Sequence, residues 1–142
     1  MLQIARHTDY AARIVLHLAC LGENGRASIA EIAEQRSLPA FFVRRLIGRL
    51  VKGGILCSSR GANGGVRLAR PAADISLLDL VRIMEGPLAL NTCVDDDRAC
   101  LLKDGCPVHS VWRDATRALE AHLSAVRFDR LATPSQSLHP AP

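Results

Sequence analysis

Hydrophobic positions recur at helical spacing through the first third of the chain and predict three helices. The first is expected over residues 8–21, where apolar residues lie one turn apart. Ser28 and Glu31 have the spacing of a capping box, in which each side chain satisfies the other residue's backbone amide, and predict the start of a short second helix. A third helix over residues 39–52 is expected to begin at a proline and to end at two glycines.

The patterning changes after the third helix. Residues 55–59 and 66–69 are typical of short strands, and the connection between them is rich in residues that tolerate positive φ, which predicts a β-hairpin. A further helix over residues 74–86 is predicted by a second capping box, formed by Ser76 and Asp79. Three helices followed by a hairpin is the element order of a winged helix-turn-helix domain, whose third helix enters the major groove of DNA.

The C-terminal part of the chain combines a segment without periodicity and a long amphipathic pattern. Apolar residues recur one turn apart from Val111 to Leu123, which predicts a long helix. The expected fold class is therefore mainly α. Its parts are a winged helix-turn-helix domain with a small β-hairpin wing (residues 1–86), a loop (87–106), a long C-terminal helix (107–131) and a flexible tail (132–142).

The composition agrees with one small helical domain. The chain has 142 residues, which is too short to contain two large enzyme domains. Apolar residues make up 49% of it and aromatic residues only 4%, a composition that favours helices over a β-sandwich. Its longest apolar run falls short of the roughly 20 residues that a membrane span requires. The N-terminus carries charged residues where a secretory signal places its apolar stretch. We therefore expect a cytoplasmic protein that makes no membrane contact.

Positive charge is concentrated in the predicted DNA-binding part. Residues 26–70 carry nine basic and two acidic residues, a net charge of +7, whereas the remainder carries nine basic and twelve acidic residues, a net charge of −3. Phosphate binding requires such a concentration. The candidate DNA contacts are outward-facing residues of the third helix and residues of the hairpin: Phe41, Arg44, Arg45, Arg49, Arg60, Asn63 and Arg67.

Two other interpretations fit parts of this pattern. A solvated basic face is the usual meaning of a run of charge, but the hairpin that follows at once favours DNA binding. A phosphate-binding nucleotide loop would require a helix directly after the glycines, and residues 66–69 are instead typical of a strand.

Three cysteines follow the third helix and hairpin in one short segment. Cys93, Cys100 and Cys106 have the pattern C-x(6)-C-x(5)-C, and thiolates gathered in this way suit an iron–sulfur cluster. Structural zinc sites favour close pairs such as C-x(2)-C, and three unrelated thiols are the remaining alternative. Cys20 and Cys57 lie in apolar stretches and are expected to be small core residues.

Three thiolates leave one ligand position open, and two residues are candidates for it. His109 follows Cys106 by one helical turn, and neutral imidazole can replace thiolate in such clusters. It could equally be an exposed residue at a helix start. Asp9 is the other candidate, although a carboxylate at the start of a helix is commonly placed there by the helix dipole.

Several of these motifs together are specific. The string HTDYAAR (7–13), the wing RGANGGVRLARP (60–71), the segment ISLLDL (75–80) and the three spaced cysteines resemble the Rrf-two superfamily of bacterial transcription regulators. The resemblance extends to about residue 130. It implies a homodimer formed through the long C-terminal helix, a winged helix that binds operator DNA in promoters, and an iron–sulfur cluster held by Cys93, Cys100 and Cys106.

The subfamilies differ in the fourth ligand that the resemblance implies. Residues 106–114 resemble the IscR group and imply His109 as ligand of a 2Fe-2S cluster. Residues 8–10 resemble the NsrR group and imply Asp9 of the partner subunit as ligand of a 4Fe-4S cluster. Residues 71–77 resemble the RirA group. Both ligand assignments therefore stay open.

The expected function is that of a sequence-specific repressor that senses iron or cluster status, nitric oxide or redox state. The alternative is a winged-helix regulator without a cluster that senses thiol oxidation directly. An enzyme is not expected, because nothing in the sequence supplies a substrate pocket or an oxyanion site for a cysteine nucleophile.

Overall fold

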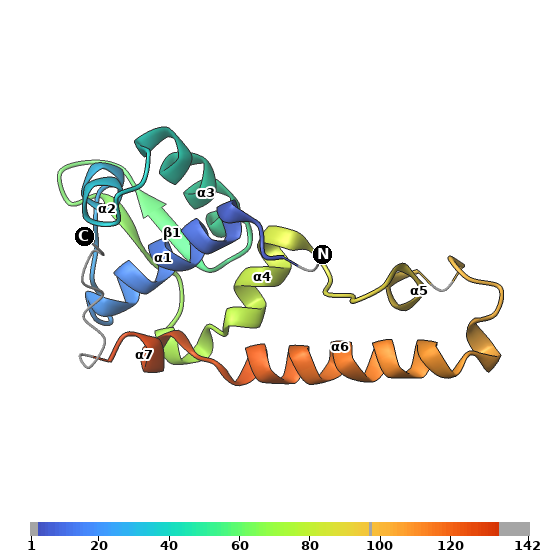
Figure 1. Ribbon diagram of the computed structural model, residues 1–142. Helices are drawn as coiled ribbons and strands as arrows, with labels where there is room; N and C mark the ends of the chain where they lie inside the picture. Colours follow the sequence, from blue (N-terminus) through green and yellow to red (C-terminus); the bar gives the residue numbers. More distant parts are fainter. Residues whose placement is uncertain (1–2, 97, 134–142) are drawn as a thin grey trace.

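The computed structural model of the protein describes residues 3–96 and 98–133. It shows an N-terminal head and a long helix that projects from its base (Figure 1). Asp97 and residues 134–142 of the expected tail lie outside the described residues. The elements are α1 (Arg6–Cys20), α2 (Ile29–Gln35), α3 (Ala40–Lys52), β1 (Leu56–Ser59), β2 (Gly65–Leu68), η1 (Ala72–Asp74), α4 (Leu77–Glu85), α5 (Thr92–Asp95), η2 (Lys103–Gly105), α6 (Pro107–Ala125) and α7 (Phe128–Leu131).

The three predicted N-terminal helices are present. The capping box of α2 is complete: the Ser28 hydroxyl accepts a hydrogen bond from the Glu31 amide at 3.1 Å, and the Glu31 carboxylate accepts one from the Ser28 amide at 2.6 Å. Pro39 caps α3 rather than occupying its first turn, a difference of one residue. Local hydrogen bonds and apolar spacing therefore suffice to place these helices.

The predicted hairpin is an antiparallel pair in which Leu56 lies opposite Leu68. An isolated bridge between Ala27 and Val66 adds a third extended segment to its edge. The turn is tight, because a Cβ atom on Gly64 would lie 2.5 Å from the Ser59 carbonyl oxygen. The glycine-rich composition of the connection is thus required by close backbone approach.

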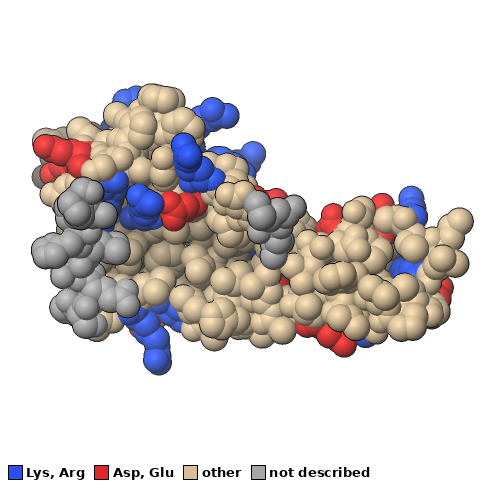
Figure 2. All heavy atoms as spheres, in the orientation of Figure 1, with Lys and Arg blue, Asp and Glu red and all other residues tan. Residues whose placement is uncertain are grey.

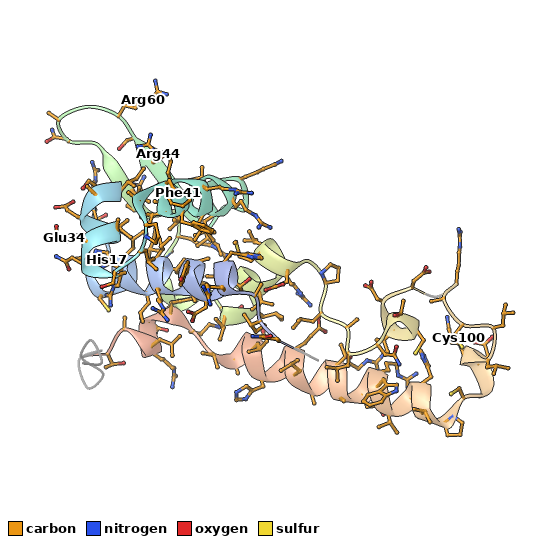
Figure 3. All side chains as sticks on the ribbon, turned by 45° about the horizontal axis from the view of Figure 1, so that its top comes forward. His17, Glu34, Phe41, Arg44, Arg60 and Cys100 are labelled. Atoms are coloured by element: carbon orange, nitrogen blue, oxygen red, sulfur yellow. The ribbon has the colours of Figure 1, made fainter. Side chains whose placement is uncertain are left out.

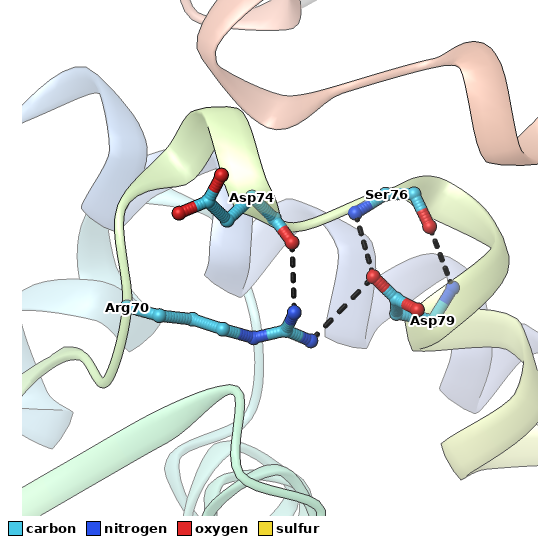
Figure 4. A network of polar contacts seen from close by, with 4 residues as sticks. All are labelled: Arg70, Asp74, Ser76 and Asp79. Carbon is cyan, nitrogen blue, oxygen red and sulfur yellow. Dashed lines mark hydrogen bonds and ion pairs between the residues drawn. The ribbon is translucent and has the colours of Figure 1, made fainter.

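The helix predicted over residues 74–86 is shorter than expected. A 3-10 turn precedes α4, and Ser76 caps α4 in the predicted capping box with Asp79. Arg70, at the end of the hairpin, donates hydrogen bonds to the Asp74 carbonyl oxygen at 2.7 Å and to the Asp79 carboxylate at 3.5 Å (Figure 4). This network ties the hairpin to the start of α4.

The core of the head forms where α1, α3, the hairpin and α4 meet. Its residues are the apolar rows predicted from helical spacing, together with inward-facing strand residues. The largest fully buried apolar side chains are Ile14, Leu18, Ile32, Leu50, Ile55, Leu56, Ile75, Leu80 and Phe128. No helix in the described part of the chain is long and apolar enough to cross a membrane.

The prediction of one helix over residues 107–131 is wrong at its C-terminal end. Helix α6 ends at Ala125, and the next residues are extended. The Leu77 amide donates to the Val126 carbonyl oxygen at 2.9 Å, and the Phe128 amide donates to the Ile75 carbonyl oxygen at 3.1 Å. These hydrogen bonds to residues 75 and 77 replace helical ones, and the Phe128 side chain is buried in the core.

The prediction that Cys20 is a core residue is also wrong. Cys20 ends α1 on its exposed side, while the core row of α1 stops at Leu18. Cys57 is half-buried in β1. An apolar neighbourhood in sequence therefore did not decide burial at the end of a helix, because only one face of the helix contacts the core.

We expect Phe128→Ala to lower the free energy of unfolding by about 3–5 kcal/mol, because it empties a fully buried aromatic site. Urea unfolding followed by circular dichroism measures the change. Phe41→Ala is the matched control, since 70% of Phe41 is exposed, and we expect it to change stability by less than about 0.5 kcal/mol. Equal effects of the two substitutions would contradict the placement of Phe128.

Candidate nucleic-acid interface and cysteine segment

Helix α3 has two chemically different faces. Val43, Leu46, Ile47 and Leu50 are buried, and α3 packs against α1 and α2. The opposite face is exposed and carries the predicted DNA contacts of the third helix, Phe41, Arg44, Arg45 and Arg49, together with Gly48 and Lys52. Burial of the apolar row therefore orients the cationic row toward solvent.

The wing lies beside this face. In Figure 3, Phe41 and Arg44 on α3 and Arg60 on the hairpin lie on the same side of the head, away from Cys100 at the other end of the molecule. In Figure 2, Lys and Arg side chains gather over the head, whereas the projecting end shows fewer of them together with several Asp and Glu side chains. The structure thus brings the two predicted groups of DNA contacts onto one surface.

The three predicted wing residues are all exposed, and two are held in place by backbone contacts. Arg67 donates to the Leu68 carbonyl oxygen at 3.2 Å. The Asn63 carbonyl oxygen accepts a hydrogen bond from Arg26, a basic residue that is not among the predicted DNA contacts. Arg26 lies 37 residues from Asn63, so no local signal reveals that it anchors the tip of the wing.

Arg49 differs from the other arginines of α3. Its Nη2 atom donates to two carbonyl oxygens at the end of α4, those of Ile83 at 3.2 Å and Met84 at 3.0 Å. Arg44 and Arg45, by contrast, have no hydrogen-bond or ion-pair partner among the residues that the structure describes. One arginine on the cationic face of α3 is therefore already hydrogen-bonded to another helix of the same chain.

The cysteine segment, residues 93–106, runs from α5 to the start of α6, and all three of its cysteines are half-buried thiols. Cys93 lies on α5, and its sulfur is 3.5 Å from the Nδ1 atom of His109, on the first turn of α6. Across residues 3–96 and 98–133, no group of three His, Cys, Asp or Glu side chains is close enough to hold a metal ion. The structure therefore places Cys93, one of the three predicted cysteine ligands, in contact with His109, one of the two candidates for the fourth ligand.

Asp9 lies elsewhere. It forms an ion pair with Arg13 at 2.8 Å on α1, and its side chain is 53% exposed. It also borders an apolar cavity of about 590 Å³ between α1, α4 and α6. In Figure 1, α1 lies in the head and α5 lies at the projecting end, so Asp9 does not approach the cysteine segment of its own chain.

A buried histidine connects two helices of the head. His17 on α1 is 5% exposed, and its Nδ1 atom accepts a hydrogen bond from Arg36 at 3.2 Å. Burial, followed by the positive charge of Arg36, holds the pKa of His17 below its ordinary value, against an opposing effect of Glu31. The neutral imidazole thus links α1 to the end of α2.

Comparison with known proteins gives consistent matches. Residues 4–134 match the Rrf2 family, described as an iron-dependent transcriptional regulator. The chain is similar to the HTH-type transcriptional regulator NsrR of Oceanobacillus iheyensis, with 31% identity over 115 residues, which cover 80% of this chain and 78% of that protein.

Two solved structures have the same fold and similar sequences. CymR, the global cysteine regulator of B. subtilis, has a TM-score of 0.77 and 27% identity, covering 93% of this chain and 97% of the other. T. potens IscR has a TM-score of 0.74 and 28% identity, covering 98% of this chain and 94% of the other. The winged helix-turn-helix fold predicted from the sequence is confirmed.

We expect the free energy of unfolding to fall as the pH drops below about 6.5, where the unfolded chain protonates His17 but the folded protein still resists protonation. Urea unfolding at a series of pH values measures this. His17→Gln has no titrating side chain there and should lose less stability over the same range. Parallel losses in the two proteins would show that His17 contributes nothing to the pH dependence.

Proposed function

Because the chain belongs to the Rrf2 family of transcriptional regulators, the Rrf-two superfamily that its motifs resemble, we propose that it is a cytoplasmic, homodimeric repressor whose cysteine segment holds an iron–sulfur cluster. As a member of this family, it is a transcriptional regulator and not an enzyme. Three parts of the chain carry the proposal: the head, the cysteine segment and α6.

The exposed cationic face of α3 beside the wing is the observation that best supports DNA binding. In this proposal α3 enters the major groove, and Arg44 and Arg45 contact guanine edges or phosphates. Phe41, at the start of α3, offers an apolar contact for a thymine methyl group. Arg60, Asn63 and Arg67 of the wing contact the sugar-phosphate backbone.

The donor chemistry of the cysteine segment fits an iron–sulfur cluster. Cys93, Cys100 and Cys106 are free thiols on one short segment, and soft thiolates are the ligands that iron–sulfur clusters require. These three residues would hold the cluster. When bound, it supplies a group that iron limitation, nitric oxide or oxidants can alter. A three-thiolate site also needs the segment to close around it, because the three side chains are not grouped in this structure.

His109 and Asp9 remain the two candidates for the fourth ligand. The 3.5 Å contact between His109 and Cys93 supports His109, the ligand expected for a 2Fe-2S cluster. Asp9 sits on α1, away from the cysteine segment of its own chain, so it could serve only as Asp9 of the partner subunit in a 4Fe-4S site. The similarity to NsrR supports this second arrangement.

The exposed surface of α6 supports the homodimer. Val108, Val111 and Trp112 are large apolar side chains exposed along its first turns, and Thr116 is the one buried residue of α6. A projecting helix with an exposed apolar stripe is stabilised by burial against another helix. In a dimer of this kind, the two α6 helices would hold the two DNA-binding heads at a fixed distance from each other.

That separation is the quantity that the cysteine segment would control. Two half-sites in DNA must be met about 34 Å apart or at a multiple of that distance. An ordered segment fixes the start of α6, whereas a released segment frees it, and the two states would then differ in operator affinity. Typical allosteric coupling of about 1–3 kcal/mol corresponds to a change of roughly 5- to 150-fold in affinity.

A regulator without a cluster, sensing thiol oxidation, is the second candidate. The similarity to CymR, named as a global cysteine regulator, favours it, as do five free cysteines without a three-residue metal site in the described chain. In that case Cys93 beside His109 is the thiol best placed to react.

We expect Arg44→Ala and Arg45→Ala each to weaken binding to a duplex selected by the wild-type protein from a random pool, and to lower the salt slope by about one if the residue contacts phosphate. Fluorescence anisotropy over a salt series measures both quantities. Arg117→Ala, an exposed arginine on α6, is the matched control. Full affinity in both α3 variants would move the DNA-reading face elsewhere.

We expect the wild-type protein, reconstituted without air with iron and sulfide, to absorb visible light and to contain both elements. Cys93→Ala and Cys106→Ala should lose nearly all of this iron, whereas Cys20→Ala, an exposed cysteine outside the segment, should retain it. Colourless, iron-free wild-type protein would reject the cluster and leave thiol sensing as the function.

Separate Asp9→Ala and His109→Ala variants distinguish the two candidate ligands. The substitution that removes the true ligand should change the visible spectrum and lower the iron content, and the other should not. Absorption spectra and iron assays of both variants give the answer. If neither substitution has an effect, both assignments are wrong.

A further inference from the structure

The last turn of α4, residues 82–85, contacts three other helices, and we name it the α4 junction. From α3, the Arg49 Nη2 atom donates to the carbonyl oxygens of Ile83 and Met84. One turn further along, α3 ends against the same place, because a Cβ atom on Gly53 would lie 2.6 Å from the Ile83 side chain. Helix α3 therefore contacts the α4 junction at two points.

The chemistry of a helix end makes the Arg49 contact a favourable one. The last four carbonyl oxygens of an α-helix lack helical hydrogen-bond donors and carry partial negative charge. An arginine side chain supplies both N–H donors and a positive charge at such a position. A guanidinium can serve two such oxygens at once, and hydrogen bonds from a charged donor are stronger than neutral ones. A lysine at the same position keeps the charge but lacks the planar donor geometry.

The other contacts of the α4 junction lead to the parts of the chain that carry the cysteine segment and Asp9. The Glu85 carboxylate accepts hydrogen bonds from the Ala5 amide at 2.9 Å and from the Thr8 hydroxyl, at the start of α1. Arg82 forms an ion pair with Glu120 of α6 at 2.7 Å. The chain then leaves α4 directly toward the cysteine segment (Figure 1).

We propose that Arg49 is a positioning residue, which locks the recognition helix to the α4 junction and so sets the orientation of α3 relative to α1 and α6. The proposal rests on the proposed function, since it concerns how α3 is presented to DNA. It changes the role of one predicted DNA contact: Arg49 acts on operator affinity through α4, while Arg44 and Arg45 act by touching DNA.

Hydrogen exchange tests the lock without DNA or iron. In Arg49→Lys and Arg49→Ala, amides of residues 82–86 should exchange faster than in the wild-type protein, because the helix end loses the hydrogen bonds from the guanidinium group to the Ile83 and Met84 carbonyl oxygens. Arg45→Lys is the matched control on the same helix and should leave this exchange unchanged. Unchanged exchange in Arg49→Lys would overturn the proposal, and because this measurement needs no DNA, its result stands even if the proposed function fails.

Operator binding tests the consequence. We expect both Arg49 variants to bind the selected duplex about tenfold more weakly, the size of one lost charged hydrogen bond, with the salt slope of the wild-type protein. A phosphate contact predicts the opposite pattern: wild-type affinity in Arg49→Lys and a slope lower by about one in Arg49→Ala. That pattern would overturn the proposal. Absence of DNA binding by the wild-type protein would instead reject the proposed function.

Discussion

Burial of one face of α3 is the constraint on which the DNA-binding surface depends. Val43, Leu46, Ile47 and Leu50 contribute to a core shared with α1, and no other orientation of α3 would remove all four from water. The arginines between them therefore face outward, beside the wing. The same burial that stabilises the head thus orients its cationic surface toward solvent.

A second constraint acts where α6 rejoins the head. The backbone hydrogen bonds around Val126 and the buried ring of Phe128 fasten the C-terminal end of α6 below α4, while its N-terminal end projects with the cysteine segment. Helix α6 is therefore held to the head along its C-terminal half, where Glu120 pairs with Arg82, and its N-terminal end carries His109 beside Cys93. In the homodimer that we propose, its exposed apolar residues and the cavity beside Asp9 offer two surfaces to the second copy of the chain.

The α4 junction connects these two regions. It lies between α3, the start of α1 and the middle of α6, and a polar, directional contact joins it to each of them. Directional contacts at a helix end hold an orientation more strictly than apolar packing, which tolerates sliding. The α4 junction therefore adds a polar connection from α6 through α4 to α3, beside the direct packing of α1 against α3.

The sequence alone determined the order of the three N-terminal helices, the hairpin and α4, both capping boxes and the two faces of α3, because each depends on residues within a turn or a strand of one another. Tertiary structure decided the end of α6 at Ala125, the exposure of Cys20, the partners of Arg26 and Arg49, and the proximity of Cys93 to His109. Those contacts join elements that are distant along the chain, and their energies depend on packing geometry that no local pattern records.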